Sequence, residues 1–145
     1  MISRAWLFRW LPVVGYLGLI TYLSSQTGSG LPSFWFMKFD KVLHTLEYGG
    51  LGFLVCHALG AWLARPRVRW LCAAAFGLAF GVVDEFHQSF VPGRQGNDPG
   101  DMLADLVGAS LGALSFLVLA HLFSRLKQAR PQQAKKPKQP KELVS

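Results

Sequence analysis

Hydrophobic residues gather in four runs of about 20 positions, and short polar segments separate the runs. The runs cover residues 6–23, 45–64, 70–86 and 102–123. A helix of about 20 apolar residues crosses a hydrocarbon layer about 30 Å thick. The pattern therefore predicts an all-α fold, a polytopic membrane protein with a bundle of four transmembrane helices in one domain, residues 1–124.

Composition supports a membrane domain and sets the last residues apart. The chain has 145 residues, of which 51% are hydrophobic and only 16% are charged. Residues 125–145 are rich in Lys, Pro and Gln, a composition that cannot bury apolar area, so we expect a disordered cytoplasmic tail. A basic tail could bind nucleic acid, but an anchor beside anionic lipid is favoured, and we expect no nucleic-acid partner.

The distribution of Lys and Arg predicts the orientation. Twelve of these residues lie on the side of the two termini and the turn at residues 65–69, and three lie on the other side. Cytoplasmic segments carry the excess of positive charge in membrane proteins. Both termini should therefore be cytoplasmic. No small-x-small cleavage site follows the first run, so we expect it to be retained as a span.

Polar side chains appear where the third run ends. Asp84, His87 and Gln88 lie at positions i, i+3 and i+4 of one helix face, and Glu85 lies about 100° around the same turn. Glycines spaced by four residues continue the face of Asp84, a pattern that packs closely against other helices. Asp84 should therefore point into the bundle. Ionisable groups at this depth are candidates for function.

A second polar group opens the second run. Asp40, His44 and Glu47 lie at i, i+4 and i+7, within about 60° on one helix face. Asp40 by itself is explained as an N-cap or first-turn acid. Glu47 lies a full turn further into apolar sequence and has no capping role. His44 and Glu47 therefore form a candidate functional pair.

The fourth run begins with a recognisable helix start. Asp98 is suited to the N-cap, Pro99 to the first helical position and Asp101 to the third. Asp105 lies one turn deeper, and two glycines continue its face down the run. We therefore expect Asp105 to face the bundle as well.

Four spans with cytoplasmic termini bring nearly all the acids to the outer end. Only Glu142 of the eight acids lies elsewhere. Seven carboxylates against three basic side chains leave a charge of about −4, and such crowding raises carboxyl pKa values or recruits a cation. The sequence predicts an acidic polar pocket that opens to the extracytoplasmic side. Its acids are Asp40, Glu47, Asp84, Glu85, Asp98, Asp101 and Asp105.

Three motifs in this order resemble the VanZ-like family, over roughly residues 10–120. They are Asp40-Lys41-x-x-His44-x-x-Glu47-Tyr48, then Gly81-x-x-Asp84-Glu85-x-His87-Gln88-x-Phe90-x-Pro92-Gly93-Arg94, then Asp101-x-x-x-Asp105. The resemblance implies a small protein of the bacterial cytoplasmic membrane. The founding member is associated with resistance to teicoplanin, whose target is an extracytoplasmic, lipid-linked peptidoglycan precursor. Family members often carry Asn where Asp105 stands.

Our first hypothesis is a membrane-embedded enzyme, a metal-assisted hydrolase or transferase that acts on a lipid-linked or cell-envelope substrate. Carboxylates in unequal environments can divide acid and base roles, and Glu47, Glu85, His44 and His87 are the candidate catalytic residues. A pocket with excess negative charge would need a divalent metal ion to accept phosphate. The candidate ligands are Asp84, His87, Asp101 and Asp105. The candidate substrate-binding residues are Arg94, Gln88, Tyr48 and Lys41, with Arg94 suited to a lipid phosphate.

Two other hypotheses about the function stay open. In one, the protein binds or carries a membrane lipid, an envelope precursor or a glycopeptide without catalysis, through Arg94 and the aromatic segment 34–37. In the other, the polar helix ends form a hydrogen-bond network that fixes the bundle as a scaffold. A transporter is less favoured because no acid lies at mid-membrane. Oligomeric state is left open by the sequence.

Overall fold

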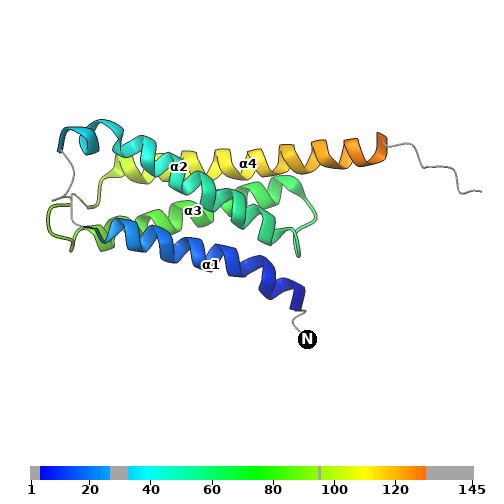
Figure 1. The fold of residues 1–145 in the computed structure, drawn as a ribbon, viewed down its shortest axis with the longest axis horizontal. Coiled ribbons are helices and arrows are strands. Elements are labelled where there is room, and N and C mark those ends of the chain that lie inside the picture. The colour runs from blue at the N-terminus through cyan, green and yellow to red at the C-terminus, as the bar shows by residue number, and fades with distance from the viewer. Residues whose placement is uncertain (1–3, 27–32, 95, 130–145) are drawn as a thin grey trace, which may run out of the picture.

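The fold is a bundle of four helices that run alternately up and down. A computed structural model describes residues 4–26, 33–94 and 96–129, and this part of the chain contains no strand. Figure 1 shows the start of α1, the turn between α2 and α3, and the end of α4 toward one end of the bundle. The helices are α1 (Arg4–Ser24), α2 (Ser33–Leu59), α3 (Pro66–Gln88) and α4 (Pro99–Ala129).

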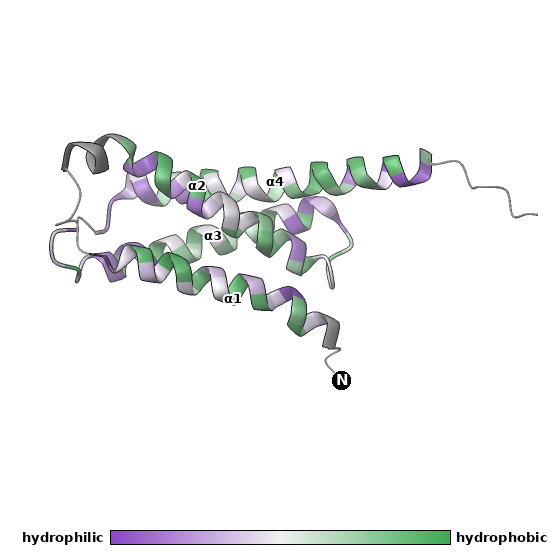
Figure 2. Cartoon of the chain, viewed as in Figure 1, coloured by the Kyte–Doolittle hydropathy of each residue, from purple (hydrophilic) through white to green (hydrophobic). Residues whose placement is uncertain are grey.

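The outer surface of the bundle is apolar. Large hydrophobic side chains such as Phe8, Leu46, Val83 and Phe123 are exposed, and Figure 2 shows green along all four helices. Such a surface is stable in lipid and unfavourable in water. Among the described residues, three segments are long and apolar enough to cross a membrane: Trp6–Ser24, Pro66–Gln88 and Pro99–Ala129.

The second predicted span is not among the described helices that are long and apolar enough to cross a membrane. In α2, His44, Glu47, His57 and several glycines reduce the mean hydropathy. The all-helical fold is confirmed, and so are three long apolar helices. The bundle of four membrane spans stays a prediction.

Glycines allow the closest helix pair, α2 and α4, to approach. A Cβ atom at Gly108 would overlap the backbone of Thr45, and one at Gly112 would overlap the backbone of Gly49. Close backbone approach is what small residues provide at helix interfaces in membranes. This packing brings the start of α2 beside the start of α4.

Several helices begin or end at other residues than the predicted runs. The second run was expected to start at Thr45 and reach Ala64, but α2 begins at Ser33 and ends at Leu59. Asp40 is therefore two turns inside the helix, and its role as an N-cap is excluded. The aromatic segment 34–37 belongs to α2, while its side chains lie outside the described residues. Helix α4 continues to Ala129, so the first five residues of the predicted tail are helical; residues 130–145 lie outside the described part.

Candidate functional site

The polar side chains gather at the end of the bundle where α2 and α4 begin and α3 ends. We call this region the acidic end. Purple residues mark it at the left of Figure 2. Its carboxylates come from three helices and from the segment that precedes α4. They are Asp40, Glu47, Asp84, Glu85, Asp98, Asp101 and Asp105.

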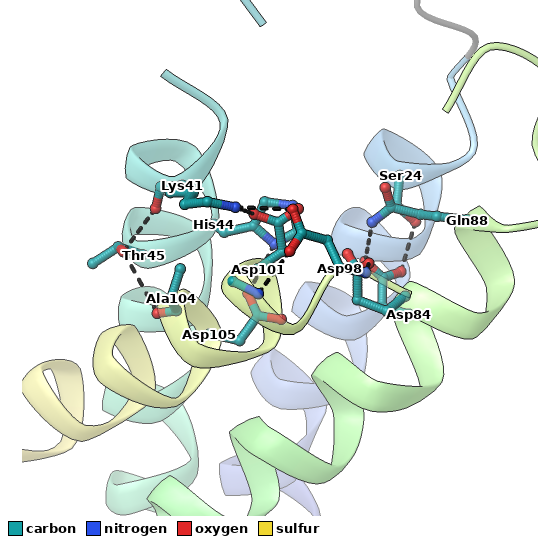
Figure 3. Close-up of polar contacts among 12 residues, drawn as sticks. Ser24, Lys41, His44, Thr45, Asp84, Gln88, Asp98, Asp101, Ala104 and Asp105 are labelled. Carbon is teal, nitrogen blue, oxygen red and sulfur yellow. Dashed lines mark hydrogen bonds and ion pairs between the residues drawn. The ribbon is translucent and has the colours of Figure 1, made fainter. Parts of the chain in front are cut away.

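Lys41 joins α2 to the start of α4. Its Nζ donates to Asp98 Oδ2 at 3.0 Å and to Asp101 Oδ1 at 2.8 Å (Figure 3). Hydrogen bonds to Asp101 and Asp98 raise the pKa of Lys41. Asp98 is the N-cap of α4 as predicted, because its Oδ1 accepts from the Gly100 N–H at 2.7 Å. Lys41 was predicted to bind substrate, and the structure gives it two carboxylate partners within the chain.

His44 and Asp105 form a buried pair between the same two helices. The distance from His44 Nδ1 to Asp105 Oδ1 is 2.9 Å, and the exposed fractions are 6% and 0% (Figure 3). Both residues face the bundle, as was expected of Asp105. Metal-binding histidines commonly use one ring nitrogen for such a carboxylate and the other for the metal. The Asp105 contact thus orients the ring and leaves Nε2 for a ligand.

Three side chains at this point are close enough to hold a cation together. One ligand atom each from Asp40, His44 and Asp101 lies within 4.8 Å of the others. Burial and the charge of Asp101 raise the pKa of Asp40, which lies before the predicted span. Mixed carboxylate and imidazole ligands suit several divalent metals. Asp101 is the single member that this group shares with the predicted ligand set.

Asp84 lies in a separate hydrogen-bonded group that joins α1 to α3. Ser24 Oγ donates to Asp84 Oδ1 at 2.7 Å, and Gln88 Nε2 donates to Asp84 Oδ2 at 2.9 Å (Figure 3). All three side chains are buried. Both carboxylate oxygens of Asp84 thus have partners inside the protein. Ser24 was not among the predicted site residues, although its position at the polar end of the first run was a signal.

Glu85 fixes the segment that leads into α4. Its Oε2 accepts from the Asp98 N–H at 2.8 Å, and its carbonyl accepts from the Asn97 N–H at 3.3 Å. Asn97 has a φ of 62°, a left-handed conformation that Asn tolerates better than most residues. The buried Glu85 side chain therefore sets where Asp98 and the start of α4 lie.

Four buried polar atoms at the acidic end have no hydrogen-bond partner in the described part of the chain. They are Tyr48 OH, Glu85 Oε1, His87 Nδ1 and Asp105 Oδ2. The Tyr48 ring stacks beside His44, with ring centroids 6.3 Å apart. Buried polar atoms without partners are rare in native proteins, because a bound water, ion or ligand usually supplies the hydrogen bond that the protein does not. These atoms therefore mark the places where a bound molecule would gain hydrogen bonds.

Arg94 contacts the end of α1 through backbone carbonyl groups. Arg94 donates from Nε to the Gln26 carbonyl at 3.2 Å and from Nη2 to the Leu23 carbonyl at 3.1 Å. These contacts satisfy one carbonyl in the last turn of α1 and one just beyond its end. The carbonyl of Glu47 accepts from Tyr16 OH at 3.1 Å, and the Glu47 side chain is half-buried. Arg94 thus has a structural role beside its predicted one.

The predicted metal ligands are distributed over several groups. Asp84 is paired with Ser24 and Gln88, Asp105 with His44, and Asp101 with Lys41. The catalytic, substrate-binding and metal roles assigned from the sequence stay predictions. A cavity of about 560 Å³ lies away from all of them, at the start of α3, where residues 65–68 line it.

Long helices with an apolar outer surface, and buried ionisable groups between their ends, define an integral membrane protein with a polar site at one end of a helical bundle. The model of one family, VanZ/LLP1, matches residues 4–121. The chain belongs to the VanZ/LLP1 family, which confirms the resemblance carried by the three motifs. No curated protein and no solved structure matches the chain.

Proposed function

We propose that this protein acts on a lipid-linked substrate of the cell envelope through its acidic end, at the extracytoplasmic face of the bacterial cytoplasmic membrane. The observation that supports this most directly is the buried His44–Asp105 pair beside Asp40 and Asp101. Burial of such a group inside a membrane protein costs free energy, and ionisable residues at such places are therefore candidates for function.

A divalent cation held by Asp40, His44 Nε2 and Asp101 would make the acidic end suitable for a phosphate-bearing substrate. The carboxylates outnumber Lys41 and Arg94 there, so an anionic headgroup would be repelled without the cation. Three protein ligands leave coordination positions open for a phosphate oxygen or a water molecule. The cation would thus attract the anionic substrate and polarise its phosphate.

Glu85 and His87 are the candidate proton donors and acceptors. Each has a buried atom without a partner in the described part of the chain, Oε1 in Glu85 and Nδ1 in His87. A water or leaving group beside the cation would need such groups in a hydrolysis or transfer reaction. Glu85→Gln keeps the side-chain shape and the acceptor for the Asp98 N–H while it removes the acid. Loss of function in a folded Glu85→Gln protein would support catalysis, and full function would favour a binder.

Metal content tests the proposal first. The protein is purified in mild detergent without chelator, supplied with Mn²⁺, Zn²⁺ or Mg²⁺, and measured by elemental mass spectrometry. We expect about one metal ion per chain in the wild type and none in His44→Ala or Asp101→Asn, because tight sites lose affinity with a single ligand. His57→Ala is the matched control, since His57 is exposed on the same helix, three turns away. Folded wild type without metal under all three conditions would exclude the metal-assisted form.

A structural network is the second candidate, and the Ser24–Asp84–Gln88 group favours it. These side chains satisfy one another across two helices and need no ligand. Under this alternative, substitutions at the acidic end would impair folding in proportion to their effect on function. The teicoplanin susceptibility of cells that produce the His44→Ala variant distinguishes the functional site from the structural network. A changed susceptibility without loss of folded protein supports a functional site, and an unchanged susceptibility supports a scaffold.

A further inference from the structure

The opposite end of the bundle holds arginine and indole side chains from three parts of the chain. We call it the basic end and define it by Trp6, Arg9, Trp10, Trp62 and Arg69. The first three lie on the first turns of α1, Trp62 lies in the turn after α2, and Arg69 lies on the first turn of α3. Every acid in the described part of the chain belongs to the acidic end. The basic end therefore has no carboxylate partner there.

The indole rings form a cluster. The ring centroid of Trp62 lies 5.5 Å from that of Trp6 and 5.9 Å from that of Trp10. The Nε1 atoms of Trp6 and Trp10 are buried and have no hydrogen-bond partner among the described residues. An indole N–H can only donate, so each needs an acceptor.

Two guanidinium groups meet beside this cluster, over Gly60. A Cβ atom at Gly60 would lie 2.8 Å from Arg69 Nη1 and 3.6 Å from Arg9 Nη1. The Nε of Arg69 is buried and also lacks a partner among the described residues. The ion pairs of this part of the chain involve Lys41 and His44, at the other end. Two positive charges thus lie close together, and no carboxylate of the described residues pairs with them.

We infer that the basic end binds the phosphate of an anionic membrane lipid, held by Arg9 and Arg69 with the indole N–H groups of Trp6 and Trp10. All four side chains are donors, and a phosphate offers several acceptor oxygens and a negative charge. Arginine favours phosphate because its planar fork binds two oxygens at once. This site is independent of the proposed function of the acidic end.

The surroundings indicate a lipid phosphate rather than a soluble one. Trp and Arg side chains at helix ends lie at the headgroup level of a membrane. Leu7 and Phe8, on the same turns of α1, are exposed and apolar. A lipid could place its phosphate on the arginines and its acyl chains against these residues, whereas a free phosphate would gain only the polar contacts.

Native mass spectrometry of the full chain with added phosphatidylglycerol tests the inference. We expect Arg9→Gln/Arg69→Gln to retain this lipid about tenfold less well than the wild type, because two charge-assisted contacts are lost. The control is Arg65→Gln/Arg67→Gln, which removes the same charge from exposed arginines at the same end and should bind normally. Equal retention by Arg9→Gln/Arg69→Gln overturns the inference. So does equal loss in the control, which would place the lipid at the cavity lined by residues 65–68 or show attraction by net charge alone.

Two further arms keep the test decisive. Trp6→Phe/Trp10→Phe preserves the aromatic rings but removes both indole donors, and we expect about threefold weaker retention if the donors bind the lipid. This pair of substitutions also serves if the arginine variant does not fold. Inorganic phosphate is added as a competitor to the wild type. Displacement of the lipid by millimolar phosphate would show a site for the free anion and overturn the lipid assignment.

Discussion

The two ends of the bundle satisfy their polar groups in different ways. At the acidic end, donors and acceptors from different helices pair with each other, as in Ser24–Asp84–Gln88 and His44–Asp105, although four buried polar atoms there lack a partner among the described residues. At the basic end, the arginines and indoles are all donors, and three buried N–H groups find no acceptor among the described residues. The first arrangement ties helices together from within, and the second needs an acceptor from outside the described chain.

This difference has a consequence for stability. A buried pair contributes to folding because removal of one member leaves the other without a partner in a medium of low dielectric constant. Donors without a partner contribute little to the stability of the folded state before a lipid binds. Once a lipid is bound, it stabilises the folded state by mass action. Substitutions at the acidic end should therefore weaken folding, and those at the basic end should weaken lipid binding.

The largest effect is expected for Asp105→Ala. It would leave His44 buried without its carboxylate and open a space beside Gly81, which we expect to cost about 3 kcal/mol of unfolding free energy. Reversible unfolding in mixed detergents, followed by circular dichroism, measures this cost. Asp105→Asn is the matched control, since its amide oxygen can still accept from His44, and it should cost less than half as much. Equal costs for the two variants would show that the loss of charge decides, not the loss of the hydrogen bond.

The Ser24–Asp84 contact should give the next largest effect. In a double-mutant cycle with Ser24→Ala and Asp84→Asn, we expect a coupling energy of about 1 kcal/mol. The same unfolding measurement gives all four corners of the cycle. Ser25→Ala is a suitable control, because the exposed Ser25 hydroxyl bonds only to the Thr21 carbonyl of its own helix. Additive effects of Ser24 and Asp84 would contradict a direct contact between α1 and α3.

A smaller effect should depend on pH through Asp98. Hydrogen bonds from the Gly100 N–H and from Lys41 hold the pKa of Asp98 below its ordinary value. The folded state therefore gains stability above the ordinary Asp pKa of about 4, and this gain is lost as the pH falls through the lower folded value. The difference in unfolding free energy between wild type and Asp98→Asn should be constant above the ordinary Asp pKa of about 4. It should disappear once the pH falls below the pKa of Asp98 in the folded state. Both partners are partly exposed, so the difference should stay below about 1 kcal/mol.

Melting temperatures of the two proteins between pH 3 and pH 7 measure this difference. Titration of the other acids is common to both proteins and cancels in the comparison. A difference that grows toward acidic pH would contradict the lowered pKa.

The smallest effect on folding is expected for Arg9→Gln/Arg69→Gln in lipid-free detergent. No ion pair of the described residues is lost, so the unfolding free energy should change by no more than about 0.5 kcal/mol. Addition of phosphatidylglycerol should then stabilise the wild type and not the variant. A loss in detergent as large as that of Asp105→Ala would remove the contrast between the two ends.

Local pattern was sufficient for much of the fold. The apolar runs predicted four helices, and the glycines spaced by four residues predicted that Asp84 and Asp105 face the bundle. The cap at Asp98 followed from residue types alone, because capping depends on neighbours in the chain. The helix start near residue 40 was wrong, because an acid before an apolar run is typical of a first turn, so Asp40 was expected at the start of the second helix, whereas α2 begins at Ser33.

The hydrogen-bond partners within the site could not be predicted from the sequence. Ser24 and Asp84 are 60 residues apart, and His44 and Asp105 are 61 residues apart. Their contacts depend on the relative depth and rotation of helices, and a shift of one turn would exchange one carboxylate for another. The predicted metal ligands therefore combined residues that the structure places in separate groups, and Asp40, although placed in the predicted pocket, was not among those ligands.

The sequence by itself determined that the chain forms long apolar helices, that most of its acids gather at one end and most of its basic residues at the other, and that it resembles the VanZ-like family. These properties reside in the order of residues along each helix. Only the tertiary structure decided that Asp84 is held by Ser24 and Gln88, that His44 is oriented by Asp105 toward Asp40 and Asp101, and that Arg9 and Arg69 meet over Gly60. The reason is physical: such contacts form between helices, and the close packing of their glycine faces sets which side chains reach each other.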